Sequence, residues 1–159
     1  ALHTTKRIHA KKQLQVPSFI PLEENVEQQI FPGLATKVIY EPDDGAISMF
    51  LQYGEHKILF MGYANKCIEE KLIKRGNLNA HLLKVSEFGD NKATSQRFLD
   101  YVDPEVAIVF KRKNNKPSAQ VMERLNESWI ETYFPYRFGL VIMKSDYNHY
   151  EMTKIRVHE

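Results

Sequence analysis

Short apolar runs separated by segments with helical spacing constrain this fold more than any other feature of the sequence. Ile58–Met61 and Val106–Phe110 are apolar throughout, which is typical of strands covered on both faces of a sheet. Leu82–Val85 lies between them and predicts a third short buried strand. Strands that alternate with helices indicate a sheet with helices packed on it. We expect the first and last of these runs to be neighbouring or near-neighbouring central strands.

Helical spacing follows each of the three runs. Ala64, Ile68 and Leu72 recur every four residues in a segment that ends at Gly76, a residue type that commonly terminates helices. Two further helices are predicted, one beginning at Thr94 or Ser95 and carrying Phe98, Leu99 and Val102, the other opening at Pro117-Ser118 and carrying Val121, Met122 and Leu125.

The segments on both sides of this region are predicted to form strands. Thr36–Tyr40 and the alternating residues from Ile47 to Leu51 flank Asp43-Asp44-Gly45, a strong turn signal, and together predict a hairpin. Further strands are predicted over 130–133, 140–143 and 153–157. The order of these elements is a hairpin, then strand–helix units, then more strands. This order predicts an α/β fold with helices packed on a mixed β-sheet.

The length and composition fit one globular domain. The 159 residues are 43% hydrophobic and 26% charged, which is enough apolar material for a core. The net charge of +2 is too small to indicate nucleic-acid binding by itself, so that function requires a local basic patch. The single cysteine, Cys67, excludes an internal disulfide framework. No stretch approaches about 18 consecutive apolar residues, so we expect no membrane insertion by this segment itself.

Residues 1–16 differ from the remainder of the chain. They are basic and poor in apolar residues, so they predict an N-terminal arm or weak helix ahead of a single domain over residues 17–159. The first residue is Ala1, with no leading Met and no apolar leader, and we expect the chain to be cut from a longer protein. The basic residues of this segment are Lys6, Arg7, Lys11 and Lys12.

Three stretches carry a resemblance through their order and spacing. The first stretch comprises Tyr53-Gly54, Lys57–Tyr63 and Glu69–Leu72, and the second is Leu83–Asp90. The third comprises Val106–Val109, Asn114-Asn115, Lys116-Pro117-Ser118 and Val121–Leu125. The first stretch resembles a strand that runs into Thr-Gly-Asp and is followed by a helix, and the second resembles a strand that runs into His-His-Gly-Ser. The third resembles a strand followed by Asn-Asn, Gly-His-Pro-Ser and a closing helix. Those elements form the second half of the metallo-β-lactamase domain in ComEC competence proteins. The resemblance covers roughly residues 17–145 and implies the C-terminal half of an αββα sandwich.

The positions where this family carries metal ligands hold other residues here. Tyr63 stands where the resemblance places the metal-bridging Asp, and Glu87 and Phe88 stand where it places paired histidines. Lys116 replaces a later histidine, and the family's His-x-His-x-Asp-His cluster would precede Ala1. A two-metal hydrolase needs carboxylate and imidazole ligands for both ions. This chain alone is therefore predicted to hold no metal, and no other cofactor is implied.

The histidines of the chain offer no substitute for those ligands. None of them is paired at an i,i+2 or i,i+4 spacing of the ligand type, so each is predicted to be an ordinary surface residue. The six are His3, His9, His56, His81, His149 and His158.

The resemblance implies a part in DNA uptake during transformation, at the extracytoplasmic face of the cell membrane. The implied partners are DNA and other parts of a membrane-embedded parent protein. We expect a non-catalytic domain with a degenerate active site that binds DNA or partner proteins. Two alternatives stay open: a metal-dependent nuclease or phosphodiesterase whose first half supplies the ligands, and a structural or interaction module of a larger membrane protein. The sequence before Ala1 would separate these hypotheses.

Two local clusters bear on DNA binding. Lys111, Arg112, Lys113 and Lys116 form a basic loop at the mouth of the former active site, and two interpretations stay open: a solvated charged loop, or a surface that contacts phosphates. A cluster of aromatic residues is predicted either to stack on the bases of a single strand or to pack in the core. Its members are Tyr133, Phe134, Tyr136 and Phe138.

Overall fold

The structure is a computed structural model of the chain, and it describes residues 23–40 and 47–156. Seven strands form one sheet, and a separate two-stranded hairpin follows. The elements are β1 (Glu27–Phe31), β2 (Leu34–Tyr40), β3 (Ser48–Tyr53), β4 (His56–Phe60), α1 (Lys66–Arg75), β5 (Leu82–Lys84), a 3₁₀ turn (Ser86–Gly89), α2 (Gln96–Val102), β6 (Val106–Ile108), α3 (Ala119–Glu127), β7 (Glu131–Tyr133), α4 (Pro135–Phe138), β8 (Gly139–Ser145) and β9 (Tyr150–Arg156).

The strands of the large sheet lie in chain order from β1 to β7. The β1–β2, β2–β3 and β3–β4 pairs are antiparallel, whereas the pairs from β4 to β7 are parallel and are joined by helical crossovers. The predicted α/β fold with helices on a mixed sheet is confirmed. As expected, β4 and β6 are near-neighbours, with β5 between them.

The helices begin and end where local chemistry favours it. The Asn65 side chain accepts a hydrogen bond from the Ile68 backbone N–H at the start of α1, and Gly76 ends that helix with φ +81°. Of the two predicted caps for α2, Ser95 is the one used, because its hydroxyl accepts from the Phe98 N–H. The predicted helices after Ala64, after Ser95 and after Pro117-Ser118 are thus present.

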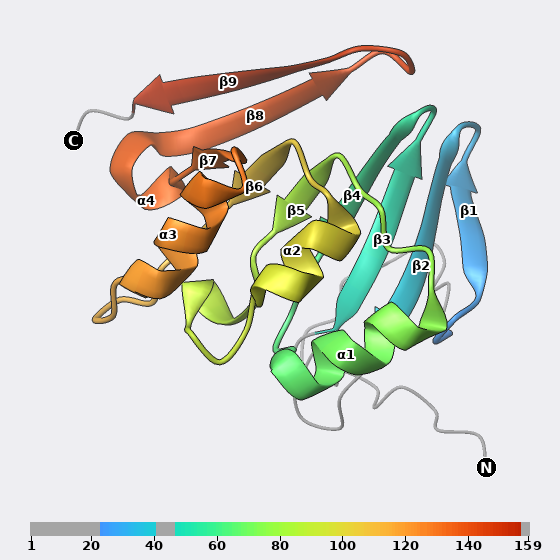
Figure 1. The fold of residues 1–159 in the computed structure, drawn as a ribbon. Coiled ribbons are helices and arrows are strands. Elements are labelled where there is room, and N and C mark those ends of the chain that lie inside the picture. Colours follow the sequence, from blue (N-terminus) through green and yellow to red (C-terminus); the bar gives the residue numbers. More distant parts are fainter. Residues whose placement is uncertain (1–22, 41–46, 157–159) are drawn as a thin grey trace, which may run out of the picture.

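The molecule has three layers. Helices α1, α2 and α3 lie side by side on one face of the sheet, where they bury the main core (Figure 1). The β8–β9 hairpin packs on the opposite face, through a smaller apolar cluster that includes Leu82, Val106 and Tyr133. Successive strand residues alternate between the two clusters: Leu83 points to the helices and Leu82 to the hairpin.

The strands are shorter than their apolar runs. β4 ends at Phe60 and β6 ends at Ile108. Phe60 and Phe110 are 38% and 40% exposed, so the prediction that both faces are covered is wrong at the carboxyl ends of these runs. The reason is geometric, because the hairpin packs on Leu82 and Val106, nearer the amino ends of the parallel strands.

Some expectations lie outside the described residues. These include the basic arm over 1–16 with His3 and His9, the turn at Asp43-Asp44-Gly45, and His158. The two strands that flank the turn do pair antiparallel. The described part of the chain contains no helix that is long and apolar enough to cross a membrane.

Candidate functional site

The carboxyl ends of β4, β5 and β6 bring three predicted site residues together. Because parallel strands end at the same edge of a sheet, the segments that follow them become neighbours. Tyr63 follows β4, Phe88 follows β5 and Arg112 follows β6. The ring centroids of Tyr63 and Phe88 lie 6.1 Å apart, and the Arg112 guanidinium lies 5.6 Å and 5.3 Å from those two centroids. We call these three residues the edge cluster.

Two buried serines hold the backbone around Tyr63. The Ser48 hydroxyl accepts a hydrogen bond from the Gly62 N–H at 3.0 Å. The Ser86 hydroxyl accepts from the Ala64 N–H at 3.0 Å and donates toward the Gly62 carbonyl at 2.8 Å. Both serines are buried, so these bonds are shielded from competition with water. The loop that carries Tyr63 is thereby tied to the turn that carries Phe88.

The turn after β5 has an unusual backbone. Glu87 and Phe88 have φ values of +45° and +56°, in the left-handed region that costs an ordinary residue about 1–2 kcal/mol. Gly89 follows with φ +78°, and a Cβ there would lie 2.9 Å from the Pro117 Cβ. The Ser118 N–H donates to the Gly89 carbonyl at 2.8 Å. Strained backbone of this kind is concentrated at functional sites.

Side chains of α1 and α3 form hydrogen bonds with the loop between the 3₁₀ turn and α2. Glu69 of α1 is fully buried and accepts hydrogen bonds from the backbone N–H groups of Thr94 and Ser95. Burial raises the pKa of the Glu69 carboxyl, and the hydrogen bonds from Ser95 and Thr94 oppose that rise. Arg124 of α3 donates from Nε to the Thr94 carbonyl at 2.9 Å and from an Nη to the Asn91 side chain at 3.1 Å. The loop between the 3₁₀ turn and α2 is therefore anchored to both α1 and α3.

Further cations and rings extend the edge cluster. The Lys84 Nζ lies 5.7 Å from the Phe88 ring centroid and donates to the Met61 carbonyl at 2.6 Å; burial lowers the pKa of this amine. The Lys111 Nζ lies 5.2 Å from the Tyr136 centroid. Arg137 lies 4.5 Å from the Phe134 centroid and 5.7 Å from that of Tyr136. Cations stacked on rings are a favourable arrangement, worth about 0.5–1 kcal/mol each at exposed sites.

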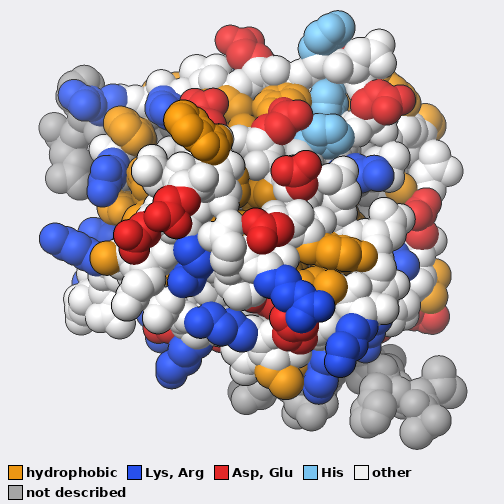
Figure 2. All heavy atoms as spheres, viewed as in Figure 1, with side chains coloured by type: hydrophobic (Ala, Val, Ile, Leu, Met, Phe, Trp, Pro, Cys, Tyr) orange, Lys and Arg blue, Asp and Glu red, His pale blue; other side chains and the backbone are white. Residues whose placement is uncertain are grey.

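The predicted basic loop is exposed along its length. Lys111, Arg112, Lys113 and Lys116 are all exposed, and none of them forms an ion pair with a described residue. A bridge between Arg112 and Asn115 closes the loop as a tight turn. In Figure 2, blue side chains lie at the left of the face, where Figure 1 places the loop between β6 and α3, and others lie in its lower part, over α1.

The predicted aromatic cluster is divided by the fold. Tyr133 is buried in the smaller core beneath the hairpin, and Phe134 packs against the main core. Tyr136 is half-buried and faces the basic loop through Lys111. The Phe138 ring centroid lies 5.6 Å from the Lys154 Nζ of β9. The predicted packing role is confirmed for Tyr133 and Phe134, whereas base stacking by the other members of the cluster stays a prediction.

The four positions where the resemblance places metal ligands carry side chains that do not suit a metal ion. Tyr63 and Phe88 present rings, Lys116 presents an ammonium group, and the Arg112 guanidinium already places a positive charge over both rings. In the described ranges, no group of three or more His, Cys, Asp or Glu side chains is arranged to hold a metal. The single carboxylate among these positions is that of Glu87, and one carboxylate does not satisfy a transition metal.

One histidine differs from its prediction. His56 is 5% exposed, whereas the sequence predicts a surface residue. Its ring packs edge-on against His81 and Tyr150, with centroids 5.8 Å and 5.2 Å away, and neither ring nitrogen has a hydrogen-bond partner among the described residues. The hairpin covers this position, which no local pattern around His56 reveals.

The resemblance predicts Tyr63 and Phe88 at one former active site with the basic loop of Arg112 at its mouth, and these three residues do lie together in the structure. Sequence reasoning missed Lys84 and Arg137 as members of the surface. The alternation of Arg137 with Phe134, Tyr136 and Phe138 was a signal that could have identified the second of these. Comparison with known proteins adds no identification: no family model matches the chain, and no curated protein matches it significantly.

Proposed function

We propose that this chain is a non-catalytic nucleic-acid-binding domain, with its binding surface at the carboxyl edge of the parallel strands. The observation that carries the proposal is the interleaving at this edge of rings with cations that form no ion pair among the described residues: Arg112 with Tyr63 and Phe88, and Lys111 with Tyr136. Cations bind the phosphate backbone, while exposed rings provide faces on which unpaired bases stack.

The charge at this surface is available to a ligand. The four cations of the basic loop lack ion pairs within the described residues, and Tyr63 is 40% exposed. Phosphate contacts without base-edge contacts give binding that is independent of sequence and strongly dependent on salt. Four cations support modest affinity at physiological salt, as suits a domain that acts beside other parts of a larger protein.

The resemblance to ComEC domains supports DNA as the ligand. Under this proposal the chain is the second half of a metallo-β-lactamase sandwich that has lost its catalytic ligands and kept a DNA-facing edge. Its parent would be a membrane-embedded competence protein that presents this domain at the extracytoplasmic face. The α/β fold and the unsuitability of Tyr63, Phe88 and Lys116 as metal ligands are compatible with this proposal.

The test is a titration of labelled single- and double-stranded DNA at two salt concentrations. A variant with Lys111, Arg112, Lys113 and Lys116 all changed to Ser should bind more weakly. Its salt dependence should fall by roughly one unit of slope for each cation that no longer neutralises a phosphate, with unchanged thermal stability. Tyr63→Ala should weaken the binding of single-stranded DNA by about tenfold and leave duplex binding nearly unchanged, since stacking is worth about 1–3 kcal/mol per base.

A matched control removes equal charge elsewhere. Lys66, Lys71 and Lys74 of α1 and Lys144 of β8 are exposed and lie outside the edge cluster. Their replacement by Ser should leave most of the affinity in place. Equal reductions in affinity for the two quadruple variants would show that the effect comes from net charge and not from this surface. Absence of DNA binding by the wild type at low salt would refute the proposal and favour a protein-interaction module.

A further inference from the structure

A cavity of about 510 Å³ lies at the other end of β4 from the edge cluster. It opens on the helix face of the antiparallel strands, beside the last turn of α1 and the segment over 76–79 that leads to β5. Its size falls within the range of about 300–1,000 Å³ that is typical of small-molecule sites. The apolar part of its lining comprises Ala35, Ile39, Phe50, Leu72 and Leu78.

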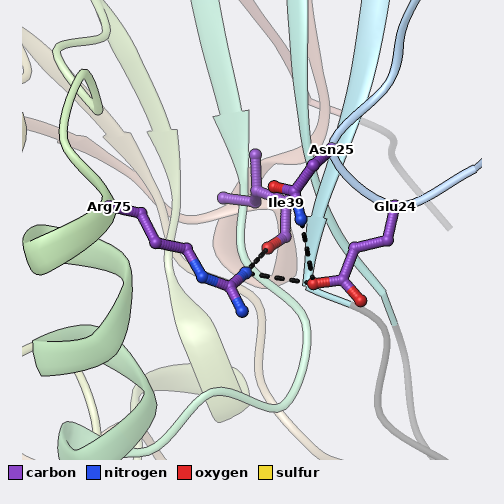
Figure 3. A network of polar contacts seen from close by, with 4 residues as sticks. All are labelled: Glu24, Asn25, Ile39 and Arg75. Atoms are coloured by element: carbon purple, nitrogen blue, oxygen red, sulfur yellow. Dashed lines mark hydrogen bonds and ion pairs between the residues drawn. The ribbon is translucent and has the colours of Figure 1, made fainter.

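An ordered polar network forms one wall of this cavity. An Arg75 Nη donates to the Ile39 carbonyl and to Glu24 Oε1, both at 3.0 Å, and Asn25 Nδ2 donates to the same Glu24 oxygen at 3.4 Å (Figure 3). The figure shows Arg75 reaching from α1 toward Glu24 and Asn25, which precede β1. The charge of Arg75 is therefore matched by Glu24. The hydrogen bonds of Arg75 connect α1 to β2 and to the segment before β1.

Two other cations of the cavity, both lysines, lack such a match. Lys37 of β2 and Lys57 of β4 are half-buried, and neither forms an ion pair with a residue in the described ranges. Glu27 lies opposite Lys37 in the strand register but is exposed. Partial burial of an ammonium group is costly unless a counter-charge approaches it. This side of the cavity therefore favours an anion.

The sheet register places apolar surface between these cations. Phe50 of β3 lies opposite Lys37, and Gln52, two residues along on the same face, lies opposite Lys57. The two lysines therefore flank β3, with an aromatic ring and an amide between them. Asn77 and Asn79 add amides at the rim. The surface offers two positive charges, several hydrogen-bonding groups and an apolar floor.

We propose that this cavity binds a small amphipathic anion, with its charged group at Lys37 and Lys57 and its apolar body against Phe50. One negative charge suits the site, because in the described ranges Lys37 and Lys57 form no ion pair and Glu27 is the one carboxylate in the lining. The proposal is independent of nucleic-acid binding, since none of these residues belongs to the edge cluster.

The experiment compares two fluorescent probes that share an apolar body and differ in charge. Anilinonaphthalene sulfonate is an aromatic monoanion, and N-phenyl-1-naphthylamine is its uncharged counterpart. The wild type should bind both probes. The double variant Lys37→Gln/Lys57→Gln should lose about tenfold in affinity for the anion and change less than about twofold for the neutral probe. The control Lys71→Gln/Lys74→Gln, on the exposed face of α1, should bind both as the wild type does.

A second variant tests the location of the site. Ala35 is half-buried and lines the cavity, so Ala35→Leu should reduce the free volume and weaken the binding of both probes together. Unchanged thermal midpoints would show that the variants remain folded. Equal anion affinity in the wild type and the lysine variant, or no binding of either probe by the wild type, would overturn the proposal.

Discussion

Tyr147, at the tip of the β8–β9 hairpin, lies directly against Gly54 in the turn between β3 and β4. A Cβ on Gly54 would lie 2.5 Å from the Tyr147 carbonyl oxygen and 2.7 Å from its Cδ1. The Glu55 N–H donates to the Tyr147 carbonyl at 3.0 Å, and the Tyr147 ring packs on that of Tyr53 at 4.7 Å. The same tyrosine hydroxyl occupies the space beside Gly33. The far end of the hairpin is thus held on glycine turns of the main sheet.

Gly54→Ala should therefore displace the hairpin tip. The substitution adds a methyl group against backbone atoms of Tyr147 and places Ala at φ +57°, so we expect a loss of at least about 2 kcal/mol in the free energy of unfolding. Amide exchange should become faster at Glu55. Gly76→Ala, at φ +81° with its nearest atom 3.9 Å away, is the control for strain alone and should spare Glu55. Unchanged Glu55 protection in Gly54→Ala would contradict this docking.

Ser86→Ala should destabilise the protein because the Ser86 hydroxyl serves the Ala64 N–H and a carbonyl of the neighbouring loop. Removing it leaves a buried donor without a partner, at a cost of about 1–3 kcal/mol in the free energy of unfolding. Ser118→Ala is the matched control, since its hydroxyl bonds the exposed Gln120 side chain and should matter little. Denaturant titration measures both, and equal values for the two would count against a role for Ser86.

Glu69 should make stability depend on pH with a definite sign. Its pKa in the folded state is raised above the ordinary value of 4.5 by burial, so the folded state binds a proton more readily than the unfolded chain does. The contribution of Glu69 to stability should therefore fall as pH rises from about 4.5 through the raised pKa.

The comparison is with Glu69→Gln, which cannot titrate. The difference in unfolding free energy between wild type and variant should move in favour of the wild type as pH is lowered through this window. Gln also loses one acceptor for the Thr94 and Ser95 N–H groups, which lowers stability at every pH. A difference that stays constant with pH would exclude a raised pKa.

Core truncations should distinguish the two central strands. Leu59 of β4 is fully buried, and Leu59→Ala should cost about 2–5 kcal/mol. Ile108 of β6 is half-buried beneath the hairpin, so Ile108→Ala should cost less. Urea unfolding of both variants gives the comparison. A loss below about 1 kcal/mol for Leu59→Ala would be inconsistent with a central position.

The layer architecture of this protein is encoded in local patterns of the chain. Apolar runs such as Val106–Phe110 and helical spacing such as Ala64, Ile68 and Leu72 reflect which face of each element is buried, and they can be recognised within a few residues. The same holds for the helix ends at Ser95 and Gly76, where neighbouring backbone groups decide the cap. The order of the elements then predicts a mixed sheet with helices on it.

Which surfaces are covered and which side chains meet depends instead on how distant segments pack. Tyr63, Phe88 and Arg112 lie far apart in the chain, and they become neighbours because three parallel strands end at one edge. The burial of His56 and the exposure of Phe110 both follow from where the hairpin packs. Contacts between distant segments depend on register and layer order, and no pattern of a few residues contains that information.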